Sequence, residues 1–260
     1  MLLEGRAAIV VGVGPGIGRE AALALAREGA DVALGARTEE RLREVAAEVE
    51  ALGRKAVCVP TNIAKEEQCR ALADACLEAF GRIDVLVQNA FRQPPMRTIE
   101  DESLEEWERS FKINVNGSIA MAKAVLPAMK EQRAGSVVFV SSLSARNSDA
   151  TLGAYAAAKA ALNSVARTLT REWGGYGIRI NTVAPGHVWG PNLKWYVDHL
   201  ANEQGRSSEA VKAEFDALSP MNKIVTSEEV ATAILFLASD LSSGMTGQVL
   251  DVNAGAWMAP

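Results

Sequence analysis

Short apolar runs alternate along the chain with longer segments in which apolar side chains recur at helical spacing. The seven runs span residues 7–11, 31–36, 55–60, 83–88, 136–141, 178–184 and 248–252. Continuous apolar strands separated by amphipathic helices are typical of a parallel sheet that helices cover on both faces. The pattern therefore predicts an α/β fold with one doubly wound, Rossmann-type sheet of seven parallel strands.

The first two predicted helices carry signals at their ends. Ile17, Ala21 and Leu25 lie along one side of the first helix, and Gly29 follows it, where a C′ glycine is favoured. Thr38 precedes the second helix as an N-cap, and acidic residues come next, where the helix dipole favours them. These signals predict one helix before the second strand and another after it along the chain.

One segment breaks the alternation, from residue 186 to residue 222. It carries Trp189, Trp195, Tyr196 and His199, and a polar stretch around residues 203–209 follows. We expect this segment to be an inserted substrate lid rather than a second domain. A chain of 260 residues is a common length for one α/β domain, so residues 1–260 are expected to form a single domain.

The composition narrows the class of protein. Hydrophobic residues make up 48% of the chain and charged residues 23%, which predicts a soluble protein with a substantial core. The formal net charge of −5 leaves no basic patch for nucleic acid, so a small-molecule substrate is the expected partner. Residues 1–6 lack a secretory signal pattern, and no run reaches membrane-spanning length, which favours a cytoplasmic protein without a membrane partner.

Three cysteines, Cys58, Cys69 and Cys76, form no C-x-x-C pair and are odd in number. Neither a disulfide framework nor a zinc site is indicated, and we expect no bound metal. Cys69 and Cys76 are expected to pack as small apolar side chains on one helix face. His187 and His199 are interpreted as polar lid residues without a catalytic role.

The end of the first predicted strand carries a glycine-rich turn. Residues 12–18 read Gly12-Val13-Gly14-Pro15-Gly16-Ile17-Gly18, so the spacing is G-x-x-x-G-x-G rather than G-x-G-x-x-G. Such glycines let the backbone approach a pyrophosphate, and the next helix offers free N–H groups and the positive end of its dipole. Tight turns also use glycine for steric reasons alone. The position between the first strand and the first helix favours dinucleotide binding.

A group of polar side chains follows the fifth predicted strand. Ser142 lies at its end, and Tyr155 and Lys159 are four positions apart, hence on one face of a helix. A Y-x-x-x-K pattern alone often means a core aromatic with a solvated lysine. The interval of 13 residues from Ser142 to Tyr155, placed after a strand and before a helix, favours a shared cleft. There a nearby ammonium is expected to lower the pKa of the Tyr155 phenol, which then transfers protons while Ser142 holds the substrate oxygen.

From end to end, the sequence resembles the short-chain dehydrogenase/reductase family. The resemblance rests on the glycine turn, on Asn114 within Asn114-Val115-Asn116-Gly117, on Ser142, Tyr155 and Lys159, on Asn181, on Pro185-Gly186 and on residues 246–250. It implies a tetrad with Tyr155 as acid and base, Lys159 lowering its pKa and binding the nicotinamide ribose, Ser142 positioning the substrate, and Asn114 organising a water relay. An asparagine that only bends or caps its helix is the alternative for Asn114.

The resemblance also implies which residues bind the nicotinamide cofactor that carries the hydride chemistry. They are Gly12, Gly14, Pro15, Gly16, Ile17, Gly18, Arg37, Asn62, Ile63, Asn89, Ala90, Tyr155, Lys159, Pro185, Gly186 and Val188. The sequence departs from the family pattern at Val11, at Asn62, within Gln88-Asn89-Ala90-Phe91, and at Gly190. Phe91 puts a ring where the family has glycine, and Gly190 removes a threonine that often contacts the cofactor.

Residues after the second strand predict the cofactor preference. Ala36 stands where relatives that prefer NAD usually carry an acid, and Arg37 follows with a guanidinium suited to phosphate. NADP(H) is therefore favoured over NAD(H). Two features oppose this interpretation: Pro15 stands where many relatives that prefer NADP have a second basic residue, and Arg37 can pair with Glu39 or Glu40.

The expected function is hydride transfer between the cofactor and a secondary alcohol or ketone. Large apolar side chains of the lid favour a bulky, apolar, cyclic substrate of steroid or alicyclic type, although the same side chains can simply pack the lid. They are Trp189, Leu193, Trp195, Tyr196 and Met221. The alternatives are a 3-oxoacyl carrier-protein reductase, which shares the tetrad, and a non-catalytic, cofactor-binding regulatory protein. The resemblance further implies a homotetramer.

Overall fold

Seven parallel strands form the central sheet of the protein. The computed structural model describes residues 1–92 and 95–258 and gives the strand order β3-β2-β1-β4-β5-β6-β9. The strands are β1 (Ala7–Val11), β2 (Asp31–Ala36), β3 (Ala56–Pro60), β4 (Val85–Gln88), β5 (Gly135–Val140), β6 (Ile178–Pro185) and β9 (Val249–Val252). The doubly wound, seven-stranded sheet predicted from the hydrophobic pattern is confirmed. The predicted bounds of β1 and β2 match these, and those of the other five strands differ by one or two residues.

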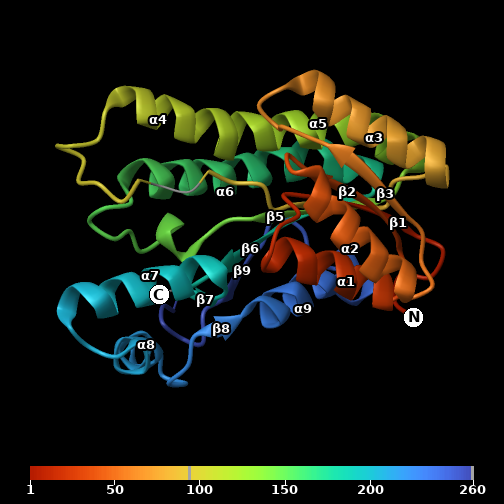
Figure 1. Cartoon of the computed structure of the whole chain (residues 1–260). Helices are drawn as coiled ribbons and strands as arrows, with labels where there is room; N and C mark the ends of the chain where they lie inside the picture. The colour runs from red at the N-terminus through yellow and green to blue at the C-terminus, as the bar shows by residue number, and fades with distance from the viewer. Residues whose placement is uncertain (93–94, 259–260) are drawn as a thin grey trace.

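Helices cover both faces of this sheet (Figure 1). The first face carries α1 (Ile17–Arg27), α2 (Glu39–Ala51) and α9 (Ser227–Ala238). The second carries α3 (Glu66–Phe80), α5 (Ser118–Gln132) and α6 (Gly153–Trp173), with α4 (Leu104–Phe111) joined to α5 by a π-helical segment, Lys112–Gly117. Three short 3-10 turns, Leu143–Ala145, Gly174–Tyr176 and Asp240–Ser242, complete these connections.

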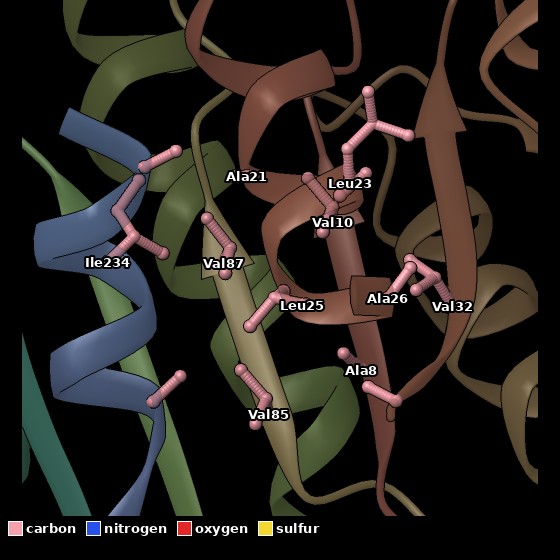
Figure 2. Close-up of a cluster of buried hydrophobic side chains, with 14 of the residues drawn as sticks. Ala8, Val10, Ala21, Leu23, Leu25, Ala26, Val32, Val85, Val87 and Ile234 are labelled. Carbon is pink, nitrogen blue, oxygen red and sulfur yellow. The ribbon is translucent and has the colours of Figure 1, made fainter. Parts of the chain in front are cut away.

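Strand β1 shows how the sheet is buried from both sides. Successive side chains of a strand point to opposite faces, so Ala8 and Val10 join the cluster beneath α1 and α9, and Ile9 joins the cluster beneath α3 and α5. Figure 2 shows the first cluster, where Leu25 of α1 and Ile234 of α9 approach the strands. Burial on both faces explains why these strands lack polar alternation in the sequence.

The order of the strands locates the crevice of the fold. Strand β1 pairs with β2 on one side and with β4 on the other, so the chain leaves these neighbouring strands in opposite directions. In open α/β sheets a ligand binds at this switch point, beyond the carboxyl ends of the strands. The turns after β1 and β4 therefore border the expected binding site.

The predicted lid folds as two helices held between two short strands. These elements are β7 (Val188–Trp189), α7 (Pro191–Gln204), α8 (Ser208–Ala217) and β8 (Val225–Thr226). Strands β7 and β8 pair in parallel, which joins the two ends of the segment. Val197, Ala201 and Val211 form a separate small core between α7 and α8, the two helices at the lower left of Figure 1.

Both predicted helix ends agree with the structure in position. Gly29, with φ +99°, follows α1 in the left-handed region, as a C′ glycine does. Thr38 is the N-cap residue of α2, but its side chain accepts no capping hydrogen bond.

Within the described part of the chain, no helix is both long and apolar enough to cross a membrane.

Candidate active site

The glycine turn after β1 brings two distant backbone segments into contact. Gly12 has φ +87°, and a Cβ atom there would lie 2.3 Å from the backbone nitrogen of Ala90. A Cβ on Gly18 would lie 2.3 Å from the carbonyl oxygen of Gly12. Gly16, with φ +116°, caps α1 without a side-chain hydrogen bond, so the N-terminus of the helix is open to a ligand. The turn therefore has the form of a cradle for a pyrophosphate.

The remaining residues of the turn lie at its rim. Pro15 is exposed, and Ile17 is half-buried against the core beneath α1. The nearest group to a Cβ placed on Gly14 would be the guanidinium of Arg41, at 3.9 Å. Arg41 was not among the predicted site residues. Its position four residues after Arg37, in the first turn of α2, is a signal that could have indicated it.

Side-chain amides fix the turn after β4 against the glycine turn. Asn89 Nδ2 donates to the carbonyl oxygen of Gly12 at 2.8 Å. Gln88 Oε1 accepts from the backbone N–H of Ala90 at 3.1 Å, and its Nε2 donates to the carbonyl of the same residue and to Ser118. The glutamine that departs from the family pattern thus holds Ala90 in place.

The other predicted cofactor residues lie at the carboxyl ends of their strands. Asn62 Oδ1 accepts from the backbone N–H of Ala64 at 3.1 Å, and Ile63 is buried against Gly117. Arg37 is exposed just beyond β2. Beyond β6, which ends at Pro185, Gly186 donates its N–H to the carbonyl of Val252 at 3.0 Å, and Val188 pairs with Val225. Ile63 can therefore meet a cofactor only through its backbone.

Ser142, Tyr155 and Lys159 meet at the carboxyl end of β5. Ser142 is the N-cap of the turn Leu143–Ala145, and its Oγ accepts from the backbone N–H of Ser144 at 3.1 Å. The Ser142 side chain also hydrogen-bonds to Tyr155. Lys159 is 3% exposed, and its Nζ donates to the carbonyl of Val140 at 2.7 Å. The predicted convergence of these three side chains on one cleft is present in the structure.

Burial sets the proton affinities of the tyrosine and the lysine. It raises the pKa of Tyr155 to about 12, against the opposing effect of the hydrogen bond with Ser142. It lowers the pKa of Lys159 to about 7. In the protein alone, burial therefore outweighs the effect of a nearby ammonium, and the lowered pKa of the phenol, expected beside a cationic nicotinamide, stays a prediction. Desolvation disfavours both charged forms, and Nζ lies 5.7 Å from the centre of the tyrosine ring.

Asn114 occupies the π-helical segment between α4 and α5 and is fully buried. Its Oδ1 accepts from the backbone N–H of Arg92 at 3.1 Å, and its Nδ2 donates to Ser110 Oγ at 3.2 Å. Its carbonyl oxygen accepts from Ser118 Oγ at 2.9 Å. π-helical turns often occur at functional sites. The side chain of Asn114 thus fixes the loop that leads from β4 to the cleft.

Phe91 borders the same cleft with its ring. It is 42% exposed, and its ring centre lies 6.3 Å from that of Tyr155 in an edge-on arrangement. The ammonium of Lys159 lies 5.8 Å from the centre of the Phe91 ring. Phe91 therefore faces both catalytic candidates, which its departure from the family pattern alone did not indicate.

His187 packs edge-on against Phe215 of the lid, with 5.2 Å between the ring centres, and burial lowers the pKa of His187.

The site fits a nicotinamide dinucleotide. The glycine cradle, where Cβ atoms would collide with backbone, leaves room for a pyrophosphate, and the Tyr155 group lies farther along the same strand ends. A bound nicotinamide would supply the hydride acceptor or donor, and the Tyr155 phenol is the candidate group of the chain for proton transfer. Among the described residues, no cluster of three or more His, Cys, Asp or Glu side chains could hold a metal. Cys69 and Cys76 lie buried on α3.

Such a fold and site define an NAD(P)-dependent oxidoreductase that acts on alcohol or ketone groups. A family model described as enoyl-(acyl-carrier-protein) reductase matches residues 12–256. The chain belongs to the short-chain dehydrogenase/reductase family. It is 34% identical over 259 residues to L-rhamnose 1-dehydrogenase (NAD(P)⁺) of Sphingomonas sp. strain SKA58, with 99% of this chain and 98% of the relative covered.

Two solved structures resemble the whole chain. L-Sorbose reductase from Gluconobacter frateurii, complexed with NADPH and L-sorbose, is 26% identical with a TM-score of 0.94, and both chains are fully covered. A 7α-hydroxysteroid dehydrogenase, complexed with NADH and 7-oxo glycochenodeoxycholic acid, is 28% identical with a TM-score of 0.88. The second match covers 97% of this chain and 94% of the other. A curated relative of the same name comes from Escherichia coli strain K12.

Proposed function

We propose that the protein interconverts a secondary alcohol and a ketone with NADP(H), and that Tyr155 transfers the proton. The observation that carries this proposal is the meeting of Ser142, Tyr155 and Lys159 at the strand ends beside the glycine cradle. The phenol, with a pKa of about 12, holds its proton at neutral pH and can donate it to the oxygen of a ketone. Ser142 positions that oxygen by hydrogen bonding.

Lys159 and Asn114 support the tyrosine in this proposal. The Lys159 ammonium binds the ribose hydroxyls next to the nicotinamide, and a charged lysine there favours the phenolate needed for alcohol oxidation. Since burial holds the pKa of Lys159 near 7, contact with a ligand hydroxyl strengthens its protonated form. Asn114 orders the neighbouring backbone and a water relay. The remaining predicted residues, from the glycine turn to Val188, line the cofactor within a single domain with the lid at residues 186–222.

Two arginines support the preference for NADP(H). Glu39, one of the two acids with which Arg37 could have paired, pairs instead with Arg43 at 2.6 Å. Within the described residues, neither Arg37 nor Arg41 has an ion-pair partner, and Arg41 lies beside Gly14. Two guanidinium groups near the strand end are suited to the 2′-phosphate of NADP(H). Arg41 thus replaces the basic residue that Pro15 removes from the glycine turn.

The test of the preference is the ratio of kcat/KM with NADPH to kcat/KM with NADH. We expect a ratio above one in the wild type and a fall of at least about tenfold in Ala36→Asp with Arg37→Ala, because one charged hydrogen bond to phosphate is lost. Arg41→Ala should lower the ratio as well, while Arg43→Ala, which removes the arginine already paired with Glu39, serves as the control. A wild type that prefers NADH contradicts the assignment.

For the substrate we propose a bulky, apolar, cyclic alcohol or ketone of steroid or alicyclic type. The lid residues behind this idea are partly used elsewhere, because Trp189 and Leu193 pack against the small lid core. Trp195 and Met221 of the lid stay exposed. The exposed ring of Phe91, edge-on to Tyr155, adds an apolar surface beside the reacting atoms. The 7α-hydroxysteroid dehydrogenase shows that such substrates suit the fold.

A polyol or sugar is the second candidate. A small cavity beside Tyr155 is lined by Arg92, Glu102 and Glu106, and one carboxylate oxygen of Glu102 is buried without a hydrogen-bond partner in the described structure. Charged groups of this kind can form hydrogen bonds with a hydroxyl-rich substrate. Two relatives, a rhamnose dehydrogenase and a sorbose reductase, are named for substrates of this class. Kinetics with cyclic alcohols, steroids and polyols separates the candidates: much better turnover of polyols contradicts the apolar proposal.

The same kinetic assay tests the two alternative functions, a 3-oxoacyl carrier-protein reductase and a non-catalytic regulatory protein. The description of the family model favours carrier-protein substrates, so a 3-oxoacyl thioester belongs in the panel. Absence of turnover with every substrate, together with tight cofactor binding, would favour the non-catalytic regulatory protein. A cytoplasmic homotetramer stays part of the proposal, and light scattering after size-exclusion chromatography measures its mass.

A further inference from the structure

Three helix N-termini meet beside the glycine cradle. Gly16 caps α1, Gly190 caps α7, and Ser227 is the first residue of α9. Ser227 Oγ is the nearest atom to a Cβ placed on either glycine, at 3.4 Å from that of Gly16 and 3.7 Å from that of Gly190. Helix N-termini present backbone N–H groups and partial positive charge. The junction therefore favours an anionic ligand, and Ser227 lies at its centre.

The hydroxyl of Ser227 has no role in the protein itself. The residue is only 6% exposed, and among the described residues its Oγ has no hydrogen-bond partner. The capping of α9 is complete without it, because Thr226 Oγ1 accepts from the N–H of Glu229 and the Glu229 carboxylate accepts from the N–H of Thr226. Among the described residues, Ser227 Oγ is not one of the enclosed polar atoms that lack a partner, so the oxygen reaches the surface of the junction. It is therefore free to donate a hydrogen bond to a ligand bound there.

The local charges are compatible with a phosphate. Glu229, in the first turn of α9, pairs with Lys223, so its carboxylate is neutralised within the helix end. Glu228 is exposed to solvent. The dipoles of α1 and α9 thus act on the junction without a buried unpaired carboxylate beside them.

We propose that Ser227 Oγ donates a hydrogen bond to the pyrophosphate of the bound dinucleotide. The glycine cradle places the pyrophosphate at the N-terminus of α1, within reach of this hydroxyl. Gly190, where the family often has threonine, offers no hydroxyl, and Ser227 supplies one from a helix next to it. This inference rests on nicotinamide cofactor binding and adds a residue from α9 to that site.

Calorimetric titration of Ser227→Ala tests the proposal with three ligands. They are NADP⁺, 2′-phospho-ADP-ribose, which keeps the pyrophosphate but lacks nicotinamide, and 2′-AMP, which lacks the pyrophosphate. We expect the Kd of the first two to rise about tenfold, because a hydrogen bond to a charged group is lost, and the Kd of 2′-AMP to stay within about twofold. Thr232→Ala, which removes an exposed hydroxyl from the same helix, should match the wild type throughout.

Each other outcome has a distinct meaning. Weaker binding of NADP⁺ with unchanged binding of 2′-phospho-ADP-ribose would assign the hydroxyl to the nicotinamide end and overturn the pyrophosphate contact. Equal weakening of all three ligands would mean a structural role and overturn it too, as would unchanged binding of all three. A wild type that binds no dinucleotide at all contradicts cofactor binding itself, independently of Ser227.

Discussion

Two regions beside the candidate active site are built in different ways. The body wall comprises the turns that follow β1, β4 and β5, and the lid wall comprises residues 186–222. On the body wall, segments far apart in the sequence lie in direct contact, and the Asn89 side-chain amide donates to the carbonyl oxygen of Gly12. On the lid wall, side chains pack on one another, with Phe215 of α8 against Tyr196 of α7 and against His187, which precedes β7. The body wall tolerates almost no added atom, whereas the lid wall depends on contacts that can be rearranged. We therefore expect catalysis and cofactor binding to depend on the first wall, and substrate selection on the second.

The largest effect is expected at Tyr155 on the body wall. Tyr155→Phe removes the proton-transferring oxygen with little change in volume, so kcat should fall by at least about 10³-fold. The Kd of the cofactor should change no more than a few-fold, which fluorescence titration measures. Lys159→Ala should damage both quantities. Substantial turnover by Tyr155→Phe would place the chemistry elsewhere.

A matched pair of glycine substitutions compares the walls directly. Gly12→Ala adds a Cβ that lies 2.3 Å from backbone in a left-handed residue, so the free energy of unfolding should fall by about 3 kcal/mol or more. Gly205→Ala, after α7 in the lid, has a similar positive φ but no atom within 4 Å, and about 1 kcal/mol is expected. Chemical denaturation measures both, and equal losses would remove the contrast between the walls.

Burial of Lys159 predicts a pH-dependent stability. Its pKa is about 7 in the folded protein and 10.5 in an exposed chain, so between these values the unfolded chain holds a proton that the folded protein lacks. Stability therefore rises with pH across this window, by at most about 1.4 kcal/mol per unit. Relative to Lys159→Met, the wild type should gain about 2 kcal/mol from pH 7 to pH 9 in urea unfolding. Parallel pH profiles of the two proteins would contradict this expectation.

The smallest effect is expected from the lid. Phe215→Ala removes two edge-on aromatic contacts, each worth about 0.5 to 1.5 kcal/mol, so KM for the substrate should change about three- to tenfold. The cofactor Kd and kcat should stay within about twofold, because the body wall is unchanged. Steady-state kinetics and cofactor titration distinguish the two. A loss of cofactor affinity equal to the change in KM would show that the walls are coupled.

Sequence patterns were sufficient for the body wall. Apolar runs and glycine spacing are local properties, and they predicted the strands and the turn in which Gly12 and Gly18 touch other backbone. The meeting of Ser142 with Tyr155 also followed from local spacing, because the strand end and the helix face fix both side chains.

Contacts between distant segments could not be read from such patterns. Arg41 beside Gly14 and Ser227 beside Gly16 depend on how α2 and α9 pack, which no local period records. The raised pKa of Tyr155 in the protein alone was not anticipated, because burial depends on every neighbouring element. In the lid, aromatic side chains suggested a substrate surface, and Trp189 proved to pack within the lid.

The short ladder between β7 and β8 has a consequence for the diversity of such enzymes. Because Val188 pairs with Val225 and Trp189 with Thr226, residues 190–224 leave and re-enter the body at adjacent points. The entropy of closing a loop grows slowly, with each doubling of length costing only about 0.6 kcal/mol. A longer, shorter or unrelated segment can therefore be grafted between the same two strands while the proton-transferring group stays in register, which makes this stretch an exchangeable cassette for new specificities.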